Sequence, residues 1–124
     1  MNNKIHNIVL NLDKSVSDIM LEVMAGDTVN EIRATLMQNG KPYTVTSDCS
    51  AVFVAKISDD SVISGNCTIS DSVIKYILTS LPSGVENGGI IKCNIIISES
   101  SDQFSTPMFG IRIHSNIQPS TQQT

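Results

Sequence analysis

The chain has 124 residues, which is enough for a single domain with its own hydrophobic core. A hydrophobic fraction of 40% and a mean hydropathy of +0.07 exclude disorder over most of the chain. The formal net charge of −4 argues against nucleic acid and anionic membranes as partners, because both attract Lys and Arg.

The first residues of the chain predict two strands. Alternating aliphatic side chains place a strand at residues 5–12 and another at residues 19–24, and Gly26-Asp27 is a turn signal that ends the second one. The N-terminus lacks a basic segment followed by an apolar one, so we expect no signal peptide. No apolar run approaches the roughly 20 residues that span a bilayer.

Residues 30–38 alternate with a period of two, with Ile32, Ala34 and Leu36 on one face. A helix is the competing prediction, because Glu, Arg, Ala, Leu, Met and Gln all favour helices. We prefer a strand, because Asn39-Gly40 follows at once and this pair is typical of a hairpin turn.

The second half of the chain predicts further strands, again separated by turn residues. They are expected at residues 51–57, 67–69, 73–79, 90–98 and 106–114, and residues 44–46 are expected to form a short extended segment. Residues 90–98 are the richest in isoleucine, which occurs on both faces, so we expect a central strand that is covered on each side.

About seven or eight short strands without a convincing helix predict an all-β fold, an antiparallel β-sandwich of the Ig-like or jelly-roll-like kind. We expect this domain at residues 1–115. Residues 116–124 have the Ser, Thr and Gln composition of a flexible tail or the start of a linker.

The residues that could carry chemistry do not form a recognisable constellation, so we expect no catalytic, cofactor-binding or metal-binding residues and no enzyme. His6 and His114 are the only histidines, on the first and last predicted strands. They would share a site only if those strands were neighbours; otherwise they are two surface histidines. No Gly-x-Ser-x-Gly nucleophile elbow and no phosphate-binding glycine loop occur.

Three weaker candidates remain. Asp59-Asp60 with its neighbouring serines offers oxygen ligands to a cation such as Ca²⁺, although a solvated loop is the simpler interpretation. A carbohydrate site would need an exposed aromatic ring, and Tyr43 is expected to be more exposed than Tyr76. The cysteines, an odd number without a secretion signal, are expected to be reduced and buried. They are Cys49, Cys67 and Cys93.

The order of the strands and turns resembles the N-terminal domain of phage baseplate upper proteins, over roughly residues 5–115. The motifs that carry the resemblance are, in chain order, Ala25-Gly26-Asp27, Asn39-Gly40-Lys41-Pro42-Tyr43, residues 51–56 with Asp59-Asp60, residues 74–79, the glycine-led strand from Gly88-Gly89 to Ile97, and Ser105-Thr106-Pro107-Met108-Phe109. Two features depart from the family pattern. A Glu is usual where Lys92 or Asn94 stands, and family members continue beyond the position of Thr124 into a linker and further modules.

The resemblance implies a structural protein of the virion tail, made in the bacterial cytoplasm. Such a domain would dock on the tail-tip hub, a distal tail protein, link it to receptor-binding proteins, and form a homo-oligomer in the baseplate. We expect docking through the outward face of the edge strands, with apolar residues such as Val16, Val45 and Val62. The alternative is an Ig-like cell-surface adhesion or carbohydrate-binding module.

Overall fold

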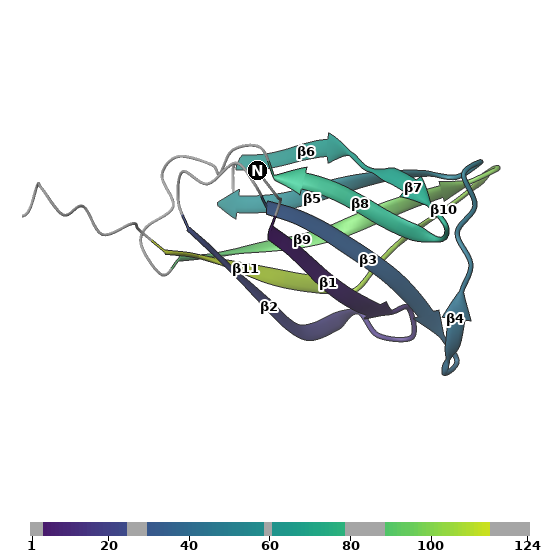
Figure 1. Ribbon diagram of the computed structural model, residues 1–124, viewed down its shortest axis with the longest axis horizontal. Coiled ribbons are helices and arrows are strands. Elements are labelled where there is room, and N and C mark those ends of the chain that lie inside the picture. The colour runs from purple at the N-terminus through teal and green to yellow at the C-terminus, as the bar shows by residue number, and fades with distance from the viewer. Residues whose placement is uncertain (1–3, 25–29, 59–60, 79–88, 115–124) are drawn as a thin grey trace, which may run out of the picture.

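A computed structural model describes residues 4–24, 30–58, 61–78 and 89–114 (Figure 1). These residues form strands and no helix, so the all-β prediction is confirmed, and none of them belongs to a helix able to cross a membrane. The strands are β1 (Lys4–Asn11), β2 (Val16–Met24), β3 (Asn30–Gln38), β4 (Lys41–Tyr43), β5 (Ser50–Ser58), β6 (Ser61–Asn66), β7 (Thr68–Ser70), β8 (Val73–Leu78), β9 (Gly89–Glu99), β10 (Asp102–Ser105) and β11 (Met108–His114).

The strands form two sheets that face each other as a sandwich (Figure 1). We call them sheet A, in the order β1-β3-β8-β7 with β4 beside β3, and sheet B, in the order β2-β11-β9-β5-β6 with β10 beside β9. β6 and β7 follow each other with one residue between them but belong to different sheets, so the chain passes from sheet B to sheet A at this side of the sandwich.

The sheets are mixed, which corrects the expectation of purely antiparallel pairing. β1 pairs with β3 in parallel and β11 pairs with β2 in parallel, whereas the other pairs are antiparallel. The reason is the short connection between β1 and β2, which carries the chain from one sheet to the other instead of closing a hairpin. Each strand then finds a parallel neighbour from further along the chain. Side-chain alternation is the same in both kinds of pair and cannot distinguish them.

The hairpin predicted at Asn39-Gly40 is confirmed. Both residues have positive φ angles, 53° and 75°, as a type I′ turn requires. This turn folds β4 back onto β3. The strands missed by the sequence patterns are β4, β6 and β10; β4 and β10 have only 3 and 4 residues, too few for a clear alternation. Residues 44–46, which we expected to be extended, form no strand.

The core lies between the inward faces of the two sheets, as the alternation predicted. Its largest fully buried side chain is Phe53 of β5, whose ring stacks on Tyr76 of β8 with centroids 4.2 Å apart and planes 11° from parallel. The stack joins sheet B to sheet A. The rest of the core is mostly aliphatic, and its side chains with no more than 2% exposure include Leu10, Ile32, Leu36, Ile74, Leu78, Ile91, Ile95, Ile97 and Ile111.

β9 is central in its sheet but is not covered on both faces, contrary to the prediction. Ile91, Ile95 and Ile97 point into the core, whereas Ile90 on the other face is 45% exposed. In a two-layer sandwich even a central strand has one face that no second sheet covers. The predicted tail at residues 116–124 lies outside the described residues.

Gly65 of β6 makes room for the aromatic stack. A Cβ atom on Gly65 would lie 2.7 Å from both Cε1 and Oη of Tyr76, the ring that stacks on Phe53. We therefore expect Gly65→Ala to lower the free energy of unfolding by about 1–3 kcal/mol, the usual cost of overpacking a core. Ser64→Ala, at the exposed neighbouring position, is the matched control and should change it by less than about 0.5 kcal/mol in urea unfolding. Equal stability of the two variants would contradict this role of Gly65.

Candidate interaction surface

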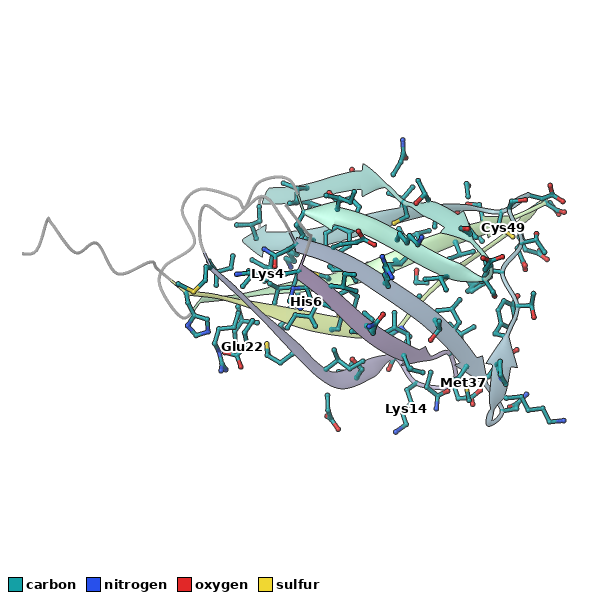
Figure 2. The ribbon with its side chains drawn as sticks, in the orientation of Figure 1. Lys4, His6, Lys14, Glu22, Met37 and Cys49 are labelled. Atoms are coloured by element: carbon teal, nitrogen blue, oxygen red, sulfur yellow. The ribbon has the colours of Figure 1, made fainter. Side chains whose placement is uncertain are left out.

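The two histidines do not form a shared site. His6 lies on β1 of sheet A, where its Nε2 is 2.9 Å from Oδ1 of Asn30. His114 lies on β11 of sheet B, where its Nε2 is 2.7 Å from Oε1 of Glu22. β11 has β2 and β9 as its neighbours, so the first and last strands are not adjacent. Each histidine is half-buried and engaged with its own partner. Figure 2 labels His6 on β1 and Glu22, the partner of His114, on β2.

Asn30 is a buried polar residue that the sequence patterns did not single out. It is 1% exposed at the start of β3, and its Nδ2 is buried without a hydrogen-bond partner in the described part of the chain. A buried amide nitrogen without a partner costs about 1–3 kcal/mol. Asn30 therefore stabilises this end of the sandwich through its Oδ1, which contacts His6, and not through its Nδ2.

Tyr43 is not the exposed ring that a sugar site would need. It is half-buried, its edge contacts Phe104 with centroids 5.6 Å apart, and its hydroxyl donates a hydrogen bond of 2.9 Å to Oε1 of Glu99. The second carboxylate oxygen of Glu99 lies 3.5 Å from Sγ of Cys49. We call Tyr43, Cys49, Glu99 and Phe104 the clasp, because they join β4 of sheet A to β9 and β10 of sheet B. Tyr76 is partly buried and packs against the core, in agreement with the prediction that it is packed.

The candidate cation loop at Asp59-Asp60 lies outside the described residues. Within the described ranges, no three His, Cys, Asp or Glu side chains are grouped as a metal site would require. The cysteines are free thiols: Cys93 is buried, as predicted, whereas Cys49 and Cys67 are half-buried.

The remaining candidates for function are the outward faces of the two sheets. On sheet A the outward residues of β3 include Arg33, whose Nε lies 2.6 Å from Oε2 of Glu31. On sheet B the outward side chains of β2, β11 and β9 surround a groove of about 390 Å³. We call it the β2–β11–β9 groove and define it by four apolar residues around Gly110. These residues are Val16, Met20, Ile90 and Met108, with exposures of 59%, 40%, 45% and 40%.

The sequence had predicted docking through apolar residues on the edge strands. Val16 of the edge strand β2 and Val62 of the opposite edge strand β6 are indeed exposed, by 59% and 58%. Val45 is 1% exposed and belongs to the core, so that part of the prediction is wrong. Its backbone nitrogen donates to Oγ of Ser72, which fixes the segment after β4 against sheet A. An isolated apolar residue in a connection gives no sequence signal of which way it points.

Comparison with known proteins gives one kind of match. No family model matches the chain, and no curated protein matches it. Among solved structures, the N-terminal domain of phage TP901-1 ORF48 is similar, with a TM-score of 0.62 at 16% sequence identity. The match covers 89% of this chain and 98% of that one. At this identity the likeness shows the fold, and the fold is one that occurs in a phage protein.

The clasp predicts a loss of stability at alkaline pH. The hydrogen bond to Glu99, then burial, then the charge of Glu99 raise the pKa of Tyr43 above its ordinary value. A group whose pKa is raised on folding contributes fully below the pKa of the unfolded chain, about 10, and loses that contribution as the pH rises through the folded pKa. We expect the stability difference between the wild type and Tyr43→Phe, measured by urea unfolding, to stay constant at lower pH and to shrink as the pH rises above about 10.

The same comparison in a Glu99→Gln background is the control. The glutamine keeps an acceptor oxygen but removes the charge, so the difference should change less with pH. A wild-type difference that is constant over the whole range would show that Tyr43 and Glu99 are not coupled.

The thiols predict a second measurable pattern. Burial raises the pKa of Cys67 to about 11 and that of Cys93 to about 12. The thiolate is the reactive form of cysteine. At pH 8 the thiolate would therefore be present in about one molecule in a thousand at Cys67 and in about one in ten thousand at Cys93. We expect iodoacetamide to leave both unmodified in the native protein and to modify both in concentrated urea, as mapped by mass spectrometry. Native labelling of Cys93 at the rate seen in urea would contradict its burial.

Proposed function

We propose that this protein is a structural module of a phage or prophage tail baseplate. It docks on the tail-tip hub, a distal tail protein, and links the hub to receptor-binding proteins. The observation that carries the proposal is the likeness of nearly the whole chain to a domain of a phage protein. The ordered motifs that resemble baseplate upper proteins support it independently of the coordinates.

The surfaces of the sandwich agree with a docking role. Apolar side chains left exposed around a groove are typical of protein interaction sites. The groove is formed by the paired strands β2, β11 and β9, and the β2–β11 register shifts between Met108 and Gly110, within the groove. In a ring-shaped assembly, several copies would present this surface around the symmetry axis.

The alternative of an adhesion or carbohydrate-binding module has less support. Sugar rings stack on exposed aromatic faces, and the two tyrosines are otherwise engaged. Tyr43 is held by Glu99 and Phe104 in the clasp, and Tyr76 is stacked on Phe53. We therefore favour protein partners, located in the virion tail.

The proposal is tested by mixing the purified chain with the hub protein encoded in the same phage or prophage genome. We expect a complex with several copies of the chain per hub assembly in size-exclusion chromatography with light scattering, because baseplates are symmetric. A hub protein from an unrelated tail is the specificity control and should not bind. A chain that stays monomeric with every protein of its own tail would contradict the proposed function.

A further inference from the structure

We propose that the free edge of β1 is a homodimer interface, in which two copies of the chain pair their β1 strands antiparallel across a two-fold axis at Asn7. The pairing would join sheet A of one copy to sheet A of the other. It needs only a second copy of the chain, so it goes beyond the proposed function and is tested without any tail protein.

β1 is an outer strand of sheet A, with β3 on one side and no strand on the other among the described residues (Figure 1). The backbone nitrogen of Leu12, the residue after β1, bonds to the carbonyl oxygen of Met37 on β3. Backbone groups alternate in direction along a strand. Ile5, Asn7 and Val9 therefore point their N–H and C=O groups away from β3, toward the free edge.

The other outer strands of the two sheets carry features by which natural sheets prevent the addition of a further strand. β2 has an irregular register beside Met108 and exposes Asp18 and Glu22, which would face each other if two copies of β2 paired around Met20. β6 has a register shift in its pairing with β5, and β7 has only 3 residues. β1 pairs with β3 without a shift over its 8 residues, has no proline, and has Lys4, its first residue, as its only Lys, Arg, Asp or Glu.

The side chains of β1 complement a second copy read in the reverse direction. With Asn7 on the two-fold axis, Ile5 of each copy stands opposite Val9 of the other. These two side chains are 45% and 55% exposed, and the pairing would cover both. The same three residues direct their backbone groups to the edge, so each facing pair would exchange both N–H···O=C bonds, with Cα atoms about 5.5 Å apart. Aliphatic pairs of this kind stabilise antiparallel strands.

Among the described residues, no like charges meet in this register. Lys4 falls opposite Leu10 of the other copy, far from the Lys4 of that copy. Beside Asn7 on β3 stands Arg33, whose Nε lies 2.6 Å from Oε2 of Glu31. The two Arg33 side chains would be separated by both copies of β1, a distance of roughly 14 Å, which exceeds the Debye length of about 8 Å at physiological ionic strength.

A second copy accounts for more of this edge than another occupant does. A strand of a different protein could satisfy the same backbone groups, but it would meet Ile5 and Val9 with matching apolar residues only by a separate coincidence. The two-fold axis supplies both matches from one sequence. It also covers the β1 edge of both copies at once, so the association closes as a dimer and does not continue into a fibre.

The direct test is the mass of the purified wild-type chain by size-exclusion chromatography with light scattering over a range of concentrations. We expect a dimer that dissociates on dilution. In NMR hydrogen exchange, the amides of Ile5, Asn7 and Val9 should be protected in the dimer and exchange rapidly in the diluted protein, whereas the amides of β2 should not change. A wild-type chain that is still monomeric at about 1 mM, or protection that appears at β2 instead, would overturn the proposal.

Charged variants test the register. We expect Val9→Glu to raise the Kd of the dimer by about tenfold or more, because it sets a charge against Ile5 of the other copy. Thr35→Glu is the matched control, since Thr35 stands beside Val9 on β3 and is exposed on the same face, and it should leave the Kd unchanged.

A mixture of two variants supplies a gain of binding that a misfolded chain could not give. Ile5→Lys should weaken the dimer as Val9→Glu does. An equimolar mixture of the two should form a heterodimer in native mass spectrometry, because the introduced charges are opposite in sign and face each other while the second Ile5–Val9 pair stays intact. A dimer that ignores Val9→Glu, or a mixture that stays monomeric, would overturn the pairing. Neither result bears on hub binding, which is measured separately.

Discussion

The stack of Phe53 on Tyr76 is the contact on which the sandwich depends. Most of the core is aliphatic, and branched aliphatic side chains pack in many relative positions at similar cost. Two flat rings held 4.2 Å apart are more selective, because sliding one sheet over the other would separate them. Gly65 of β6 has no side chain, and this leaves the space that the ring of Tyr76 on β8 occupies.

With the sheets fixed in this way, the described polar groups mainly stabilise the fold. The clasp joins β4 to β9 and β10 through Tyr43 and Glu99, and His6 contacts Asn30 at the other end of β3. His114 and Glu22 connect β11 to the edge strand β2. Each of these polar groups is bonded to another group of the same chain. The surfaces left for function are therefore the outward faces of the sheets, where side chains have no second layer to pack against.

The topology places the groove. Because β1 and β2 are consecutive in the chain but lie in different sheets, β2 becomes an edge strand beside β11, the last strand that the structure describes. Val16 and Met20 from near the N-terminus thus meet Met108 and Gly110 from near the C-terminal end of the described residues. A groove built from such distant segments forms only when the whole domain has folded.

The sequence by itself determined the all-β class, the alternation that separates inward from outward residues, and the Asn39-Gly40 hairpin, because these depend on local backbone preferences and on a period of two. It did not determine that β1 pairs in parallel with β3 and β2 with β11, that Val45 is buried, or that Ile90 is exposed, because alternation does not show which strand lies alongside or what covers the second face. The β2–β11–β9 groove was decided by the tertiary structure alone. Gly110 has no local signal of its own, and its effect exists only because strand pairing lays Met20 across it.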